Sequence, residues 1–313
     1  MGAQVISQVL VLFILMAVGF LSAKLKITTK EAAGYFSSIC IKIMLPCLIL
    51  SSFFRPFDRE LLQGAGVVLV AAFAVYAFGI LLAWVYPYLL GMKGPERGVH
   101  RYALIVPNSG LIGFAVVEGV LGPLYLFHVS FFNVPMGLLA FSVGIWLITK
   151  ESGNSGGNAP LTLSWKYFVN APIVATVIGF ALFFFSVPVP APLEQSIRLL
   201  GGITTPLFMV IIGITIAQAN IKRLLGHWRV YITVAARLLG IPALAGFLCY
   251  LAGVRDALLI VTVLLTAMPA ATTTSVLAAM YDVAVEEASA IVILSTILCA
   301  LTIPLTVILL QNL

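Results

Sequence analysis

Two segments of this strongly apolar sequence carry residue types that could bind a substrate, and the first lies around Pro107. It reads RYALIVPNSGLIGFAVVEGVLG, and seven positions at its centre contain Pro107, Asn108, Ser109, Gly110 and Gly113. Proline removes an amide donor and clashes with the preceding turn, and glycine removes the side chain, so a helix is predicted to break here and to leave backbone groups unpaired. Taken alone, this segment fits an ordinary proline kink as well as a binding site.

The second segment reads TAMPAATTTSVLAAMYDV, in which Pro269 is followed by four hydroxyl residues: Thr272, Thr273, Thr274 and Ser275. Two interrupted helices in corresponding places indicate a transporter site, because half-helix N-termini present free amides and the positive end of the helix dipole to an anion. Hydroxyls that bond to carbonyls of their own helix are the alternative. The predicted substrate-binding residues are Asn108, Ser109, Gly110, Thr272, Thr273 and Thr274. The predicted helix breaks, where the two helices cross, involve Pro107, Gly113 and Pro269.

Charged residues inside apolar segments are costly, and they are therefore functional candidates. Lys42 lies four residues before Pro46 and is favoured as a counter-charge to an anion or as a gating partner, with snorkelling or pairing as the alternative. Glu118 is expected to reach the water at the outer membrane surface, and Arg237 the water at the inner surface. We assign supporting or gating roles to Lys42, Pro46 and Glu118.

No metal, cofactor or enzyme chemistry is expected. His100, His128 and His227 are far apart and have no acidic cluster near them in the sequence. The four cysteines fall in apolar segments without C-x-x-C spacing, which argues against a disulfide framework and a metal site. The apolar segments also lack the nucleophile and base, or the metal set, of an intramembrane enzyme.

The composition indicates which elements must position these residues. Of 313 residues, 62% are hydrophobic and 9% charged, too few polar side chains to cover a water-soluble globule. The apolar runs are long and continuous, which favours an all-α membrane protein over a β-barrel. About ten transmembrane helices are predicted, at residues 5–22, 32–54, 62–90, 102–121, 124–149, 166–186, 193–218, 228–250, 256–280 and 287–310.

The chain is predicted to contain two inverted five-helix repeats. Three pairs of positions recur at an offset of roughly 160 residues: Pro46 with Pro206, Pro107 with Pro269, and Leu61 with Leu224. The expected parts are a first repeat at 1–150, a cytoplasmic linker at 151–165 and a second repeat at 166–313. Because each half holds an odd number of spans, the second half enters the membrane from the opposite side.

The net charge of +6 reflects basic residues scattered through short loops, so it indicates topology and no nucleic-acid partner. One set of loops holds Lys24, Lys26, Lys30, Lys93, Arg97, Arg101, Lys150, Lys166, Lys222, Arg223 and Arg229. The other set holds only Arg55, Arg59, Arg198 and Arg255. The positive-inside rule therefore places the first set in the cytoplasm and both termini outside it.

Three motifs carry a resemblance that covers nearly the whole chain: MLPCLIL, PNSGLIGFAVVEGVLG, and the segment from TAMPAATTTSVLAAMYDV to the end. The sequence resembles the auxin efflux carrier family, which includes plant PIN-type carriers and bacterial malate or malonate permeases. The resemblance implies a scaffold of spans 1, 2, 6 and 7, a moving domain of the rest, and a substrate carboxylate at the crossing of spans 4 and 9. By position, these roles fall on Pro107, Asn108, Gly113 and Pro269, and on the residues around Pro46. Ala115 stands where the family usually has proline, which leaves the break point in span 4 open.

These observations predict a secondary transporter that moves a small organic anion across a cell inner membrane by alternating access. The alternatives are a sodium-coupled symporter of the bile-acid type and a non-transporting membrane sensor with the same fold. The expected partners are the anion and the lipid bilayer. The oligomeric state stays open, with a homodimer as one alternative.

The topology yields a first testable prediction. A reporter fused after Leu313 is expected to be active outside the cytoplasm, and one inserted in the 150–160 segment is expected to be active inside it, because the basic loops stay inside. Activity of the C-terminal fusion only in the cytoplasm would rule out both this topology and the inverted repeat.

Overall fold

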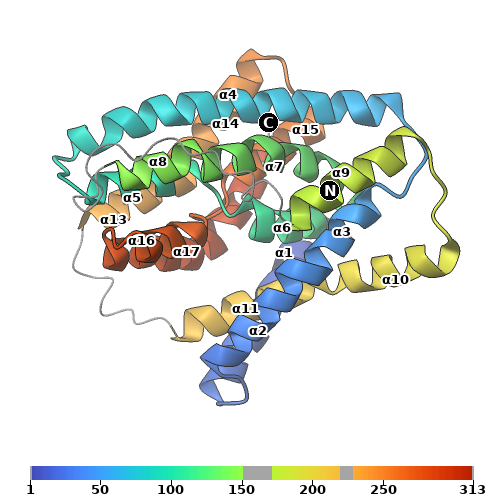
Figure 1. Cartoon of the computed structure of the whole chain (residues 1–313), viewed down its shortest axis with the longest axis horizontal. Helices are drawn as coiled ribbons and strands as arrows, with labels where there is room; N and C mark the ends of the chain where they lie inside the picture. The colour runs from blue at the N-terminus through green and yellow to red at the C-terminus, as the bar shows by residue number, and fades with distance from the viewer. Residues whose placement is uncertain (1, 151–170, 219–227, 312–313) are drawn as a thin grey trace. The chain divides into compact units, whose positions relative to one another are not determined.

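The computed structural model describes residues 2–150, 171–218 and 228–311, and the regular structure there is helical (Figure 1). The α-helices are α1 Gly2–Lys24, α2 Lys30–Ile39, α3 Leu45–Ser52, α4 Arg59–Leu89, α5 Glu96–Ile105, α6 Phe114–Leu121, α7 Leu126–Phe141, α8 Val143–Thr149, α9 Ala171–Phe184, α10 Ala191–Gly202, α11 Thr204–Gln218, α13 Trp228–Ala235, α14 Ile241–Leu251, α15 Asp256–Thr266, α16 Thr273–Met280 and α17 Val285–Gln311. Shorter turns are η1 Cys40–Met44, η2 Ser109–Gly113 and η5 Ala236–Gly240, which are π-helical, and the 3₁₀ turn η3 Pro123–Tyr125. The all-helical prediction is confirmed for these residues.

Six helical stretches in the described part of the chain are long and apolar enough to cross a bilayer. They are Glu31–Ser52, Arg59–Leu89, Pro123–Thr149, Ala191–Gln218, Trp228–Leu251 and Val285–Leu310. Four shorter apolar helices are Leu10–Lys24, Ser109–Leu121, Ala171–Phe184 and Asp256–Thr266, each within or overlapping one of the remaining predicted spans. A transmembrane helix needs about 20 apolar residues, and the four shorter helices have fewer. The number of ten spans therefore stays a prediction.

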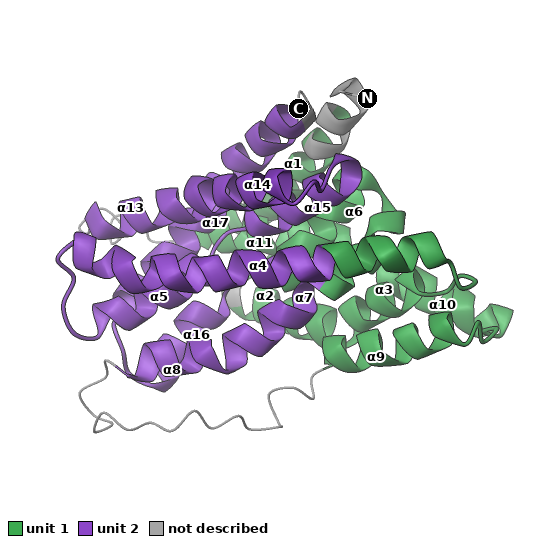
Figure 2. Cartoon of the chain, turned by 90° about the horizontal axis from the view of Figure 1, so that it is seen from above, with its two compact units in different colours: residues 1–67, 110–131, 169–219 green, residues 68–109, 132–168, 220–313 purple. Residues whose placement is uncertain are grey.

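The chain forms two compact units, each assembled from segments far apart in the sequence (Figure 2). Unit 1 comprises Met1–Val67, Gly110–Phe131 and Val169–Ala219, and unit 2 comprises Val68–Ser109, Phe132–Phe168 and Asn220–Leu313. The regions of predicted spans 1, 2, 6 and 7 fall in unit 1, as the resemblance implies for a scaffold, but residues 110–131 belong to unit 1 as well.

Both units draw on both halves of the sequence. Packing therefore does not follow the predicted repeats at 1–150 and 166–313. Two halves that arose by duplication of one sequence can still pack together in mixed units, so the packing does not test the repeat. The repeat stays a prediction. The predicted 151–165 linker lies outside the described residues, as do Lys166, Lys222, Arg223 and His227.

Unit 1 is held together by a close approach of α1 and α11. A Cβ atom added to Gly19 would lie 2.0 Å from the Val210 carbonyl oxygen, and one added to Gly213 would lie 1.9 Å from the Met16 carbonyl oxygen. The two backbones are therefore in direct contact, which only glycine allows at these positions.

An aromatic cluster joins three further helices of unit 1. The ring of Phe127, in α7, lies 4.9 Å from the ring of Phe53, at the end of α3, and 4.8 Å from that of Phe183, in α9. All three rings are fully buried. Tilted and edge-on ring contacts of this kind add roughly 0.5–1.5 kcal/mol each beyond the area they bury.

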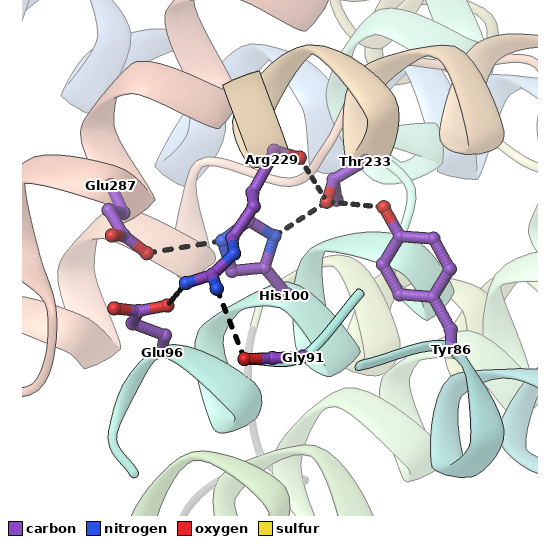
Figure 3. A network of polar contacts seen from close by, with 7 residues as sticks. All are labelled: Tyr86, Gly91, Glu96, His100, Arg229, Thr233 and Glu287. Carbon is purple, nitrogen blue, oxygen red and sulfur yellow. Dashed lines mark hydrogen bonds and ion pairs between the residues drawn. The ribbon is translucent and has the colours of Figure 1, made fainter. Parts of the chain in front are cut away.

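In unit 2, a buried histidine connects helices that are distant in the sequence (Figure 3). The His100 Nδ1 atom lies 2.5 Å from the Thr233 Oγ1 atom, and its Nε2 atom lies 3.1 Å from a Glu287 carboxylate oxygen. The Tyr86 hydroxyl lies 2.7 Å from the same Thr233 hydroxyl. The network thus joins α4, α5, α13 and α17. The sequence does not indicate the contact of His100 with Glu287, because tertiary packing brings Glu287 to it from 187 positions away.

A second interaction fixes the start of α13. The Arg229 guanidinium lies 2.8 Å from a Glu96 carboxylate oxygen and donates a hydrogen bond to the Gly91 carbonyl at 3.1 Å (Figure 3). Because both side chains are about one-third exposed, this ion pair contributes only modestly to stability. Its effect is to hold the beginning of α5 against α13.

The glycine contact in unit 1 generates a second prediction. Gly19→Ala is expected to destabilise the protein by at least about 1–3 kcal/mol, because the new methyl group overlaps the Val210 backbone and the helices must separate. Gly34→Ala is the matched control, since a Cβ there meets nothing within 4 Å, and it should be neutral or stabilising by up to about 1 kcal/mol. Melting temperatures of the purified variants in detergent measure both effects. Equal melting temperatures for the two variants would contradict the close contact.

Candidate substrate site

The first helix break lies at Pro107. Helix α5 ends at Ile105, and Val106 takes an extended conformation with φ −93° and ψ 105°. Proline disfavours the helical conformation of the residue before it and has no N–H to donate, which explains why the helix ends here. The chain resumes as η2 after Asn108 and continues into the regular helix α6 through Ala115. The interruption therefore lies before Ser109, so the absence of proline at position 115 does not move it.

The second break surrounds Pro269. Helix α15 ends at Thr266, and α16 begins at Thr273 with Thr272 at its N-cap position. The residues between the two helices carry only one side-chain hydroxyl, that of Thr272. The backbone groups freed by this break thus need partners from elsewhere in the fold.

The two breaks are joined by backbone hydrogen bonds. The Asn108 N–H donates to the Pro269 carbonyl at 2.8 Å, and the Ala271 N–H donates to the Val106 carbonyl at 3.0 Å. Pro107 and Ala270 form an isolated antiparallel bridge between them. This pairing satisfies part of the freed backbone in the way that a buried non-helical segment of a membrane protein requires.

A serine of α17 supports the same place. The Ala270 N–H donates to the Ser295 Oγ atom at 3.1 Å, and that hydroxyl donates to the Val292 carbonyl of its own helix. Ser295 is fully buried. The second break is therefore fixed against α17 as well as against the first break.

Arg237, in the π-helical turn η5, binds the ends of both broken helices. Its guanidinium donates to the Leu104 carbonyl at 2.8 Å, the Thr266 carbonyl at 2.5 Å and the Met268 carbonyl at 3.1 Å. The side chain is completely buried. The expectation that Arg237 reaches water at a span end is wrong. The carbonyls at the C-terminal ends of α5 and α15 hold the guanidinium inside the fold.

The side chains beside the breaks differ in their partners. The Ser109 hydroxyl donates to Asn133 Oδ1 at 2.7 Å, and the Thr273 hydroxyl lies 2.8 Å from the Tyr102 hydroxyl. The buried Thr274 hydroxyl has no partner among the described residues. Asn108 as a residue is 7% exposed, and its side-chain amide makes no hydrogen bond to the described part of the chain.

The alternative for the threonines, bonding of their hydroxyls to carbonyls of their own helix, is not seen at the start of α16. Thr273 pairs with Tyr102 instead, and Thr272 is exposed and forms no side-chain cap. The three threonines therefore present one hydroxyl in a pair, one buried and unpaired, and one exposed, while the Ser275 hydroxyl donates to the Ala288 carbonyl at 3.4 Å.

Comparison with known proteins decides the family. A family model described as membrane transport protein matches residues 4–307. The chain belongs to this family. It is the auxin efflux carrier family that the sequence resembles, so that prediction is confirmed.

Curated relatives of this membrane transport protein match over almost their full length. An "uncharacterized transporter" of Methanothermobacter thermautotrophicus is 26% identical over 299 residues, which is 95% of either chain. A "putative malonate transporter" of Rhizobium meliloti is 26% identical over 304 residues, 96% of this chain and 94% of the relative. An "uncharacterized transporter" of Methanocaldococcus jannaschii is 22% identical over 301 residues, 95% and 96% of the two chains. The protein is thus a multi-pass membrane transporter and not an enzyme.

The remaining predicted residues of this transporter belong to unit 1. Lys42, in η1, is exposed and has no ion pair among the described residues, and Pro46 lies in the first turn of α3. The partly buried Glu118 carboxylate, in α6, accepts a hydrogen bond from the Thr205 hydroxyl of α11. Gly110 and Gly113 lie in η2, also within the residues of unit 1.

The sequence analysis identified the prolines and the polar residues of the breaks, but not the two side chains that bond to the breaks, Arg237 and Ser295. Nothing in the local sequence links Arg237 to Leu104, or Ser295 to Ala270. A stronger signal was available for Arg237, because two predicted breaks free several carbonyls in an apolar interior and such groups need a donor. In the described residues, the four cysteines are free and no group of three or more His, Cys, Asp or Glu side chains could hold a metal ion.

Proposed function

We propose that this protein is a secondary transporter that moves a small organic carboxylate across the membrane by alternating access, with the carboxylate bound beside the two helix breaks. The observation that carries the proposal is the Asn108 amide. Asn108 as a residue is 7% exposed, its amide makes no hydrogen bond to the described residues, and that amide is not among the polar atoms buried without a partner, so it is open to a ligand. An amide in a mostly buried residue that has no partner in the protein can donate a hydrogen bond to a carboxylate, so a substrate that supplies this partner is favoured at this position.

The charge distribution at the breaks favours an anion. Helices α5 and α15 end there, and each contributes the negative end of its dipole. Arg237 donates to carbonyls of both ends and offsets this negative charge. Helix α16 and the turn η2 begin there, and the positive end of the dipole at a helix N-terminus suits a carboxylate. The proposed binding residues are Asn108, Ser109, Gly110, Thr272, Thr273 and Thr274.

The relative from Rhizobium meliloti described as a "putative malonate transporter" supports a carboxylate as the substrate class. The proposal includes ten spans in two inverted repeats, with spans 4 and 9 crossing at Pro107 and Pro269. It also includes an inner-membrane location with both termini outside the cytoplasm, and supporting or gating roles for Lys42, Pro46 and Glu118. A homodimer is left open.

Uptake into proteoliposomes tests the proposal. We expect saturable accumulation of radiolabelled malonate that unlabelled malate reduces and dimethyl malonate does not, because the ester lacks the charge that the site favours. A thermal-shift screen of mono- and dicarboxylates would identify a better substrate if malonate is a weak one. If every carboxylate that binds gives no more uptake than empty liposomes do, the proposed carboxylate transport is refuted and the sensor alternative is favoured.

The third prediction concerns Asn108. Asn108→Ala should reduce carboxylate affinity on the order of 10- to 100-fold, because a hydrogen bond to a charged group contributes roughly 1.5–3 kcal/mol. The melting temperature should change little, since the amide bonds to no described residue. Asn133→Ala is the control, because it breaks the Ser109 contact and should lower stability. A large drop in the melting temperature of Asn108→Ala with affinity retained would show a structural amide instead.

The fourth prediction concerns energy coupling. No Asp or Glu lies close in the sequence to Asn108 or to the hydroxyl run from Thr272 to Ser275, and a sodium site usually needs a carboxylate to offset dehydration of the ion. Uptake should therefore persist when sodium is replaced by potassium or choline, with movement driven by the anion gradient, by the membrane potential, or by protons through Glu118. Strict sodium dependence would favour the bile-acid-type alternative.

Glu118→Gln separates the remaining two routes. Glutamine keeps the acceptor for the Thr205 hydroxyl but cannot titrate. Loss of the pH dependence of uptake in this variant, with the melting temperature unchanged, would select proton coupling. An unchanged pH profile would assign the driving force to the anion gradient or the membrane potential.

A further inference from the structure

Arg237 is a buried charge without a buried counter-ion. Its side chain has no exposed surface, and no carboxylate in the described residues pairs with it. Each of its three guanidinium nitrogens donates instead to a carbonyl at or just after the C-terminal end of one of the two broken helices. An isolated buried charge is unfavourable by several kcal/mol, so these carbonyls must supply the compensation.

The helix ends match that charge. Each helix C-terminus carries about half an elementary negative charge, and two such ends together offset one cation. The carbonyls of Leu104 and Thr266 belong to the last turns of α5 and α15, and that of Met268 follows the end of α15. The guanidinium therefore lies where two negative dipole ends converge.

Transporters with broken helices use the same groups for a different purpose. In such folds, unwound carbonyls and half-helix C-terminal ends coordinate the sodium ion or proton that drives transport. Here the carbonyls are already engaged at hydrogen-bond distance by a side chain of the protein. A mobile cation would have to displace the guanidinium to reach them.

We propose that the guanidinium of Arg237 occupies the place of a coupling cation, as a resident cation that the protein supplies itself. The helix ends are then permanently neutralised, and the positive N-terminal ends at the breaks act on an anion without a co-transported cation. Removing the guanidinium while keeping the fold should create a vacant cation site. This inference concerns the helix ends and does not depend on which substrate the protein carries.

The test measures the melting temperature of the full-length protein in detergent under two conditions. The first is choline chloride alone, and in the second part of the choline is replaced by guanidinium or sodium at constant ionic strength. Wild type should show no stabilisation by either ion. Arg237→Ala should melt at least about 5 °C lower in choline, and millimolar guanidinium should restore at least half of the loss. Sodium should restore a smaller part.

Arg229→Ala is the matched control, because this arginine lies in the same stretch, Trp228–Leu251, but pairs with Glu96 at the surface. Neither ion should restore its stability. A loss in Arg237→Ala that neither cation reverses, or one reversed equally in Arg229→Ala, would overturn the proposal and leave Arg237 as an ordinary structural clamp. Stabilisation of wild type by sodium would also overturn it, because it would reveal a separate cation site.

A second pair of variants keeps the test decisive if Arg237→Ala does not fold. Arg237→Lys retains the charge with a compact ammonium group, and Arg237→Gln retains N–H donors without the charge. The lysine variant should be the more stable of the two by several degrees, and only the glutamine variant should gain stability from added cations. Equal stability of the two variants would show that hydrogen bonding alone matters. Since no step requires a substrate, failure to transport malonate would not affect this result.

Discussion

Backbone groups inside a bilayer must find partners within the protein, and this constraint governs the centre of unit 2. The sequence breaks two helices with prolines and so frees carbonyls and amides in an apolar interior. The structure satisfies them by pairing one break with the other, by the Ser295 hydroxyl, and by the Arg237 guanidinium. Each partner comes from a different element, so the breaks are stable only when the surrounding helices are in place.

These supports also determine what is left for a substrate. Arg237 uses the negative ends of α5 and α15, and the two backbone bonds use Val106 and Pro269. What remains is the Asn108 amide, the Thr272 and Thr274 hydroxyls, and the N-terminal ends of α16 and η2. This is the combination to which we propose that a small carboxylate binds. The network around His100 holds α5 against α13 and α17 and thereby fixes the direction from which α5 enters the break.

The sequence predicted the parts of this arrangement that depend on local chemistry. Proline and glycine act on their own backbone, so the interruptions near Pro107 and Pro269 could be located within a few residues. Long apolar runs indicated a helical membrane protein, and three motifs indicated the family. Local patterns say nothing about contacts between distant segments. The pairing of His100 with Glu287 and the burial of Arg237 therefore escaped prediction, and Lys42, chosen for its place before Pro46, is exposed. The two compact units also combine segments from both halves, which the offset between the prolines does not indicate.

An experimental density map of the protein in a lipid nanodisc with malonate would test the central claim most directly. The account predicts non-helical main chain at Pro107 and Pro269, guanidinium density of Arg237 in contact with the carbonyls of α5 and α15, and a ligand carboxylate within hydrogen-bond distance of the Asn108 amide. A continuous helix through either proline would contradict it. So would a map in which Arg237 leaves the carbonyls to bind the ligand itself.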